Sequence, residues 1–145
     1  MQIETIKAAL INIIKNTLDV IVIAGDVKRP ITRASAKIDI LPYTVSAACA
    51  GARDVSLDID IYYYPLNADR PLAECQLVAQ KLADALSDGF EVQNTWLIPD
   101  DELSFEFSNE ALACQFTVSY VETVEETGEF VENLIYNGEE MTDGN

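Results

Sequence analysis

The stretch that decides the fold is Asp54-Val55-Ser56-Leu57-Asp58-Ile59-Asp60-Ile61-Tyr62-Tyr63-Tyr64-Pro65. Apolar and polar side chains alternate along it, which is the pattern of a strand with one buried face and one wet face. The apolar face holds Val55, Leu57, Ile59, Ile61 and Tyr63, and the polar face holds Ser56, Asp58, Asp60, Tyr62 and Tyr64. Pro65 ends the strand because it lacks a backbone donor. The stretch therefore predicts a central strand.

The segments before this strand predict one helix and three extended pieces. Apolar residues at helical spacing predict a helix over residues 2–18, and residues 19–24 predict a short strand. Residues 36–42 alternate again and predict a strand that Pro42 interrupts, after which residues 43–49 continue in an extended path. The three residues that follow form a turn, so this path and the central strand make a long antiparallel hairpin.

The segments after the central strand predict a second helix and three more strands. A helical apolar stripe begins soon after the strand and ends at Asp88-Gly89. Residues 90–98 are expected to be extended. Residues 102–108 and 111–121 alternate like the central strand, and Asn109-Glu110 turns one into the other as a second hairpin.

The expected order of elements is α-β-β-β-α-β-β-β. Strands grouped around two helices indicate an α+β fold in which both helices cover one face of a mainly antiparallel sheet, with mixed pairing left open. The 145 residues fit a single domain. We assign residues 1–122 to that domain and residues 123–145 to an acidic C-terminal extension.

Charge is unevenly distributed along the chain. Residues 1–81 contain nine acids and nine bases, whereas residues 82–145 contain sixteen acids and no base, which accounts for the net charge of −16. Such a chain should repel nucleic-acid phosphates and anionic membranes. Polar residues within 2–18 do not fit a signal peptide, so we expect none. The acidic part is interpreted either as a solvated surface or as a surface for asymmetric docking, past which DNA could slide.

The sequence lacks the usual residues for catalysis and cofactor binding. Histidine, the commonest general base and metal ligand, is absent, and no Gly-rich phosphate loop follows a strand. We therefore expect no enzyme, no catalytic residue and no cofactor. Cys49, Cys75 and Cys114 are widely spaced, and we expect reduced, mostly buried thiols, as in a protein folded in a reducing cytoplasm.

Asp58 and Asp60 are the candidates for a metal site. At strand spacing both carboxylates project to one face, about 6–7 Å apart. Hard cations take six or more oxygen ligands, and nothing in the sequence makes further ligands converge here. Two solvated strand acids are the plainer interpretation, so we predict no metal.

Two segments are candidate interfaces with another subunit or a partner. Lys28, Arg29 and Arg33 form the basic cluster of the sequence, in a loop that is either solvated or docks an acidic partner. The Glu-rich C-terminal segment also carries an apolar cluster that a solvated tail does not need: Phe130, Leu134, Ile135 and Tyr136. We expect this segment to dock on its own sheet or on an adjacent subunit.

Short motifs in a fixed order resemble one protein family. They are Lys37-Ile38-Asp39-Ile40-Leu41-Pro42, Asp58-Ile59-Asp60-Ile61-Tyr62-Tyr63-Tyr64-Pro65, Glu74-Cys75-Gln76, Phe116-Thr117-Val118-Ser119-Tyr120 and Glu132-Asn133-Leu134-Ile135-Tyr136-Asn137-Gly138-Glu139-Glu140. The family is the tail terminator, or tail completion, proteins of phages and prophages of Gram-positive bacteria. The resemblance covers nearly the whole chain.

The resemblance implies an α+β fold similar to lambdoid tail terminators and a ring, usually a hexamer, that caps the tail tube at the neck of the virion. Such a ring ends polymerisation of the tail tube protein, borders the sheath protein where there is one, and offers a surface to the head-neck connector protein. Genomic DNA would pass through without specific binding, and no membrane would be involved. Assembly would take place in the cytoplasm of the host bacterium.

Two other functions fit parts of the sequence. An acidic adaptor or DNA-mimic module that binds a basic host protein would use the sixteen acids that follow Lys81. A metal-dependent enzyme would use Asp58 and Asp60. Oligomeric state, salt-sensitive capture of a host protein and calorimetry with Mg²⁺, Mn²⁺ or Ca²⁺ would separate the three.

Overall fold

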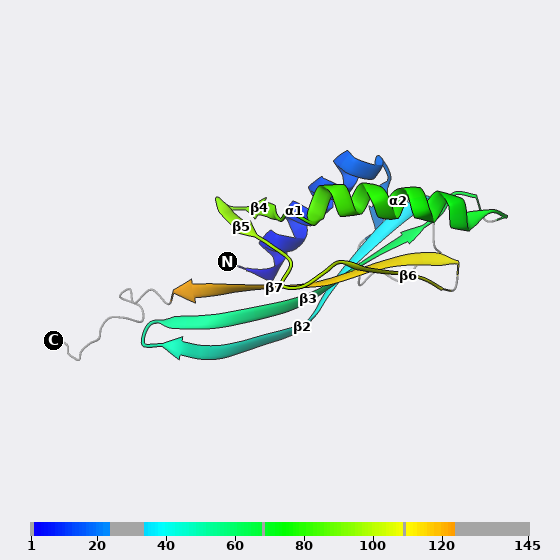
Figure 1. Cartoon of the computed structure of the whole chain (residues 1–145). Coiled ribbons are helices and arrows are strands. Elements are labelled where there is room, and N and C mark those ends of the chain that lie inside the picture. Colours follow the sequence, from blue (N-terminus) through cyan, green and yellow to red (C-terminus); the bar gives the residue numbers. More distant parts are fainter. Residues whose placement is uncertain (1, 24–33, 68, 109, 124–145) are drawn as a thin grey trace. The chain divides into compact units, whose positions relative to one another are not determined.

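The computed structural model of the chain describes residues 2–23, 34–67, 69–108 and 110–123. Its elements are α1 (Ile3–Leu18), β1 (Ile21–Ile23), β2 (Ser35–Cys49), β3 (Ala52–Tyr64), α2 (Pro71–Leu86), β4 (Phe90–Val92), β5 (Thr95–Leu97), β6 (Ser104–Ser108) and β7 (Ala111–Thr123) (Figure 1). They confirm the α+β class and the predicted order of elements. None of the helices in the described ranges has the length and apolar character to cross a bilayer.

Five strands form one sheet, in the order β1-β2-β3-β7-β6, and β4 and β5 form a separate hairpin. β1 runs parallel to β2, and β6 runs antiparallel to β7. Arg53 of β3 contacts Glu122 of β7, and Asp58 of β3 contacts Thr117 of β7. These two contacts mean that β3 and β7 run antiparallel. The sheet is therefore mixed but mainly antiparallel, and β3 is its middle strand.

The chain divides into two compact units that share these strands. The first holds residues 1–43 and 56–119, and the second holds residues 44–55 and 120–145. We call the described part of the second unit, residues 44–55 and 120–123, the ribbon. The predicted boundary between residues 122 and 123 lies at the end of the described chain and stays a prediction.

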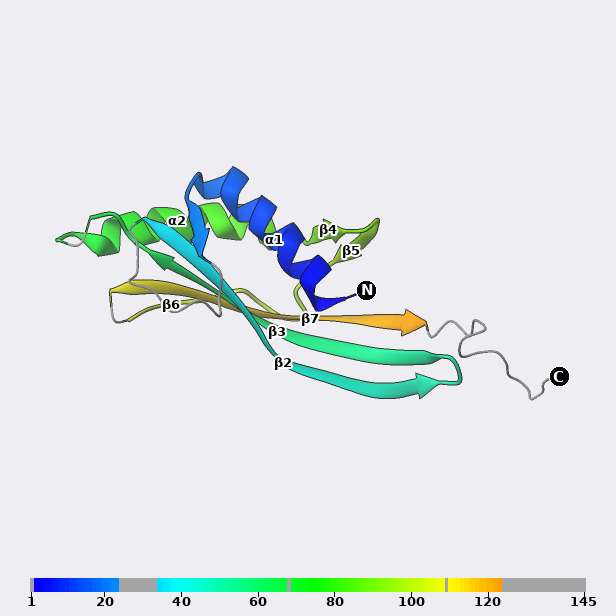
Figure 2. The same cartoon turned by 180° about the vertical axis from the view of Figure 1, so that it is seen from behind.

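The core of the first unit lies between its helices and the apolar face of the sheet. Figures 1 and 2 show α1 and α2 on the same side of the sheet, and the two helices contact each other. Burial follows the predicted alternation, since Leu57, Ile59 and Ile61 are at most 1% exposed. The helices bury the residues at their 3.6-residue period: Ile6, Leu10 and Ile14 on α1, and Cys75, Val78, Leu82 and Leu86 on α2.

Pro42 does not interrupt its strand, so that prediction is wrong. β2 runs without a break from Ser35 to Cys49. The reason is the position of β2 in the sheet, because β1 pairs with it only from Ser35 to Lys37. Among the described residues no strand lies along that side of β2 at Pro42, so a residue without an N–H is tolerated there.

The segment 90–98, expected to be extended, folds back on itself as the β4–β5 hairpin. Gln93 and Asn94 both have positive φ, at 50° and 63°, which gives the two-residue turn that joins the strands. Phe90 packs edge to face against Phe116 of β7, with ring centroids 6.3 Å apart. The hairpin also contacts α1 through β4.

The ribbon differs from the rest of the sheet because, among its described residues, only Val55 is a buried apolar side chain. Residues 44–49 are exposed on both faces of the strand, including Val45 at 39%. Ala50 and Gly51 form the tip of the β2–β3 hairpin, where Gly51 has a φ of 81°. Arg53 and Glu122 form an ion pair between β3 and β7.

Candidate functional site

The polar face of the sheet in the first unit carries a cluster of carboxylates. An open hollow of about 660 Å³ lies on this face and includes Asp58, Asp60, Asp101 and Glu102 in its lining. Leu41, Gln115, Phe116 and Thr117 complete it. We call this feature the acidic hollow. Asp58 and Asp60 reach it because the alternation of β3 turns the residues between its buried ones to the polar face.

The segment between β5 and β6 brings in the other two carboxylates. Pro99 bridges to Val118, and the N–H of Asp100 donates to the carbonyl of Thr117 at 2.8 Å. The Ser119 hydroxyl donates to Asp100 Oδ2 at 2.6 Å. This segment therefore follows β7, which places Asp101 and Glu102 beside strand residues that lie far away in sequence.

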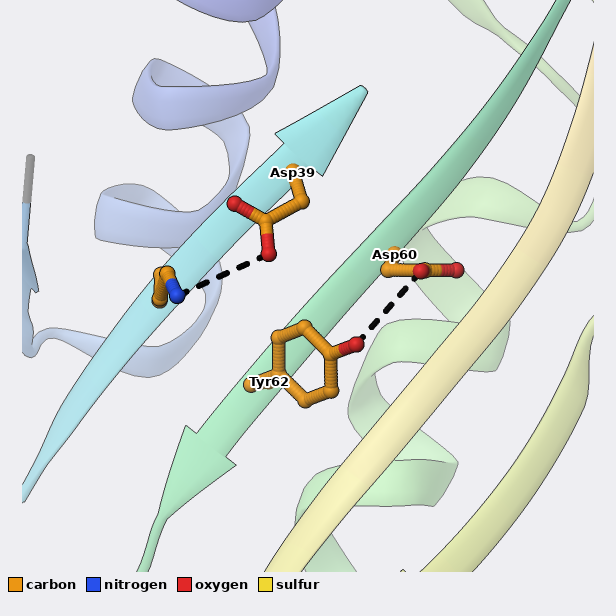
Figure 3. Close-up of polar contacts among 4 residues, drawn as sticks. Asp39, Asp60 and Tyr62 are labelled. Carbon is orange, nitrogen blue, oxygen red and sulfur yellow. Dashed lines mark hydrogen bonds and ion pairs between the residues drawn. The ribbon is translucent and has the colours of Figure 1, made fainter. Parts of the chain in front are cut away.

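Hydrogen bonds and one ion pair fix the carboxylates of the polar face. The Thr117 hydroxyl donates to Asp58 Oδ1 at 2.8 Å, and the Tyr62 hydroxyl approaches Asp60 Oδ2 at 3.4 Å. Lys37 Nζ lies 3.6 Å from Asp39 Oδ2 and 5.9 Å from the centre of the Tyr62 ring (Figure 3). Lys37 therefore places a positive charge beside Asp39 and Tyr62 on the polar face.

The polar face shifts the proton affinity of two of its groups. Burial raises the pKa of Asp60, and the neighbouring charges of Asp39 and Asp58 raise it further, against the opposing effect of the Tyr62 hydrogen bond. Burial also raises the pKa of Tyr62, and the charge of Asp60 adds to that effect. Burial is the main cause of both shifts, and the carboxylates of Asp39, Asp58 and Asp60 add to it. Carboxylates gathered on one face disfavour an approaching anion.

The geometry offers no support for a metal at Asp58 and Asp60. In the described part of the chain, no group of three or more His, Cys, Asp or Glu residues is placed to hold an ion. Asp58 is instead a hydrogen-bond acceptor for Thr117. The acidic hollow can repel phosphates or attract a basic segment.

The cysteines divide into two kinds. Cys75 and Cys114 are buried, as expected, and burial raises the pKa of the Cys114 thiol to about 12. Cys49 is exposed at the end of β2, so two of the three thiols are buried. It lies in the ribbon, where residues 44–49 are all exposed.

Glu74 of α2 accepts hydrogen bonds from the end of β3 and from the loop that joins β3 to α2. It accepts the hydroxyl of Tyr63 at 2.5 Å and the N–H groups of Leu66 and Asn67 at 2.7 and 3.0 Å. Burial raises the pKa of Tyr63, and the hydrogen bond to Glu74 adds to the effect. The Glu74-Cys75-Gln76 motif thus has a structural role that the sequence pattern did not reveal.

Trp96 is a further residue whose position the sequence did not indicate. Its indole N–H donates to the carbonyl of Asp88 at 2.9 Å, although the side chain is 57% exposed. Gly89 permits this arrangement, because it has a φ of 103° and a Cβ there would lie 2.8 Å from the carbonyl oxygen of Leu97.

The candidate interface residues of the sequence lie outside the described residues. This applies to the basic cluster of Lys28, Arg29 and Arg33 and to the apolar cluster of Phe130, Leu134, Ile135 and Tyr136. Their proposed roles stay predictions.

Comparisons with known proteins point to one family. A family model described as phage tail terminator protein matches residues 5–129. No curated protein matches the chain. One solved chain, whose title states no function, aligns over 87% of this chain and 99% of its own length at 14% identity, with a TM-score of 0.44. That likeness is too weak to carry a conclusion about fold or function.

Proposed function

This chain belongs to the phage tail terminator family, and on that premise we propose that six copies form a closed ring that caps the tail tube. As a member of this family it is a structural phage tail protein and a component of the virion, and it interacts with tail and head components. The ring ends polymerisation of the tail tube protein and provides the surface for the head-neck connector protein. Where the tail has a sheath, the ring also borders the sheath protein. It has no catalytic role.

A closed ring needs two different surfaces on each subunit, because a head-to-tail contact joins unlike patches. The basic cluster of Lys28, Arg29 and Arg33 supplies one candidate patch and an acidic surface of the neighbour the other. The C-terminal extension, residues 123–145, docks on its own or on the adjacent subunit through Phe130, Leu134, Ile135 and Tyr136. These roles follow from charge and apolar character in the sequence.

The acidic hollow fits the passage of DNA through such a ring. Asp58, Asp60, Asp101 and Glu102 present carboxylates on one face of the sheet. If this face lines the lumen, phosphates are repelled at every subunit and the DNA moves without binding. The unequal distribution of charge along the chain, with all of its −16 after Lys81, favours the same arrangement.

The match of residues 5–129 to the tail terminator family carries this proposal. Mass photometry and negative-stain imaging of the purified chain should show rings with a central opening. The rings should also shorten the tubes formed by the cognate tail tube protein, because capped tubes stop growing. A chain that stays monomeric at high concentration and leaves tube length unchanged would contradict the proposal.

An acidic adaptor that binds a basic host protein is the second candidate. The gathering of four carboxylates in the acidic hollow favours it. Its distinguishing result is a salt-sensitive complex between one copy of this chain and a basic protein. Asp58→Asn with Asp60→Asn should weaken that complex, whereas ring formation should survive the same changes.

A further inference from the structure

Among the described residues, no further strand lies along either outer side of the ribbon. β3 lies between β2 and β7. On the outer side of β2, the pairing with β1 stops at Lys37. On the outer side of β7, the pairing with β6 stops at Gln115, and the bridge from Pro99 reaches only to Val118. Past these points, the described chain places no further strand along either side.

Apart from Val55, which is 1% exposed, the described residues of the ribbon bury little apolar surface. Residues 44–49 are exposed on both faces, and Val121 of β7 is 63% exposed. A few strands without a packed apolar face are marginally stable in water. A long, exposed edge without charges is a template for pairing with another chain, and natural proteins usually protect such edges.

The ribbon is nearly neutral in a strongly acidic chain. The stretch from Ile40 to Ala52 contains no charged residue, although the chain has a net charge of −16. The charged residues of the ribbon are Arg53, Asp54 and Glu122, and Glu122 is paired with Arg53 of the same chain. A second copy therefore meets little like-charge repulsion here, which makes the ribbon a suitable surface for self-association.

We propose that the outer side of β2 in the ribbon pairs with the outer side of β7 in a second copy, so that the sheet continues from subunit to subunit. β2 and β7 both run antiparallel to β3, so the new contact joins parallel strands. The contact is head-to-tail because it uses two different sides of the ribbon, as ring closure requires. This inference rests on the proposed ring and specifies its subunit contact.

The register of the ribbon provides a direct test. The two-residue turn of Ala50 and Gly51 sets Cys49 opposite Ala52, and the register of β3 with β7 sets Ala52 opposite Thr123. Cys49 and Thr123 therefore lie in one row with β3 between them. Two strand spacings of about 4.8 Å place their Cα atoms roughly 9.6 Å apart within one chain.

A disulfide between positions 49 and 123 can therefore form only between two copies. The Cα atoms of a disulfide are rarely more than about 7 Å apart, whereas adjacent strands are about 4.8 Å apart. Alternation places both residues on the polar face, because Ile38 and Ile40 of β2 and Cys114, Phe116 and Val118 of β7 are buried on the other. Thr123 and Cys49 are both exposed.

The experiment uses the full chain with Thr123→Cys under mild oxidation. We expect a ladder of covalent multimers on a non-reducing gel that ends at the size of the ring and collapses to monomer with reductant. The matched control is Leu77→Cys, which adds a cysteine of similar exposure on α2 and should give no ladder with Cys49. Thr123→Cys combined with Cys49→Ser should give nothing larger than a dimer.

A second pair guards against a local defect at Thr123. Ala47→Cys with Val121→Cys and Cys49→Ser tests the neighbouring row of the same contact and should restore the ladder. Circular dichroism of each variant checks that it is folded. Absence of the ladder from both pairs, which share one register, would overturn the proposed contact with Cys49 beside Thr123.

Mass photometry without oxidation separates this inference from the proposed ring. Rings that give no ladder would overturn the strand contact and leave the ring standing. A ladder from open chains of varying length would support the contact and overturn the closed ring. Monomers without a ladder would overturn both.

Discussion

The helix-covered sheet of the first unit and the ribbon of the second unit share the strands β2, β3 and β7 but bury very different amounts of surface. In the first unit, β3 places Leu57, Ile59 and Ile61 under two helices, each at most 1% exposed. In the ribbon, residues 44–49 of β2 are exposed on both faces. Apolar burial is the main source of folding free energy, so the first unit supplies the stability of the chain. The ribbon offers surface for assembly.

The largest expected effect on the free energy of unfolding comes from truncating a β-branched apolar side chain of the first unit. The same kind of truncation in the ribbon is its control. Ile59→Ala should lower the free energy of unfolding by about 2–5 kcal/mol, because it leaves a cavity beneath the helices. Val45→Ala should change it by about 0.5 kcal/mol or less in dilute protein. Urea denaturation monitored by circular dichroism measures both.

Protein concentration sharpens this test. If the ribbon is buried between copies, the destabilisation caused by Val45→Ala should grow as the protein assembles, whereas that caused by Ile59→Ala should persist at every concentration. Equal losses from the two variants in dilute protein would mean that the ribbon contributes to the monomer core, against the comparison drawn above.

The next largest effect is expected at Glu74, which joins the middle strand of the sheet to α2. Glu74→Gln should cost about 1–3 kcal/mol, because an amide nitrogen cannot accept the hydrogen bonds that the carboxylate receives from Tyr63, Leu66 and Asn67. Asp84→Asn, on an exposed position of the same helix, is the matched control. Thermal unfolding of both variants is the measurement, and equal stabilities would show that the contact is unimportant.

A smaller effect should appear in alkaline solution. Burial, with the hydrogen bond to Glu74, raises the pKa of Tyr63 in the folded chain above its ordinary value of 10.0. The unfolded chain therefore loses this proton first, so the contribution of Tyr63 is present below about pH 10 and is lost as pH rises further. Melting temperatures measured from pH 8 to 11 should fall less steeply for Tyr63→Phe than for the parent chain. Parallel curves would contradict the assignment.

The smallest effect concerns the acidic hollow. Burial and the nearby carboxylates raise the pKa of Asp60 above its ordinary value of 3.8, so the folded chain holds this proton more tightly than the unfolded chain. Ionised Asp60 therefore opposes folding once the pH exceeds its folded pKa. Asp60→Asn should stabilise the chain at pH 7 by no more than about 0.5 kcal/mol and should not do so at pH 3. Destabilisation at pH 7 would instead mean that the carboxylate makes a favourable contact.

Local periodicity predicted the regular elements well. The alternation around Ile59 gave β3 and its buried face, and the helical spacing of apolar residues gave α1 and α2. These patterns could be read from the sequence because each element shows its own apolar period, which marks the face that it buries.

Features that depend on tertiary neighbours were harder to predict. Gln93-Asn94 is not a strong turn signal, because glycine is the usual residue where φ is positive, so the β4–β5 hairpin was read as one extended segment. Asp101 and Glu102 join Asp58 and Asp60 only because Pro99 and Asp100 pair with β7. β2 continues through Pro42, and Cys49 at its end is exposed. Both features depend on the position of β2 in the sheet, which cannot be predicted from the neighbouring residues in the sequence.

The neutral stretch from Ile40 to Ala52, in a chain of net charge −16, has a consequence for the kinetics of association. Free copies of the chain repel one another because they carry the same net charge, and this repulsion decays over about 8 Å at physiological ionic strength. Like-charge repulsion would therefore slow the approach of two copies, but it would not weaken a contact already made through the neutral stretch. Added salt should therefore accelerate association far more than it slows dissociation, and low salt should preserve a store of unassembled subunits.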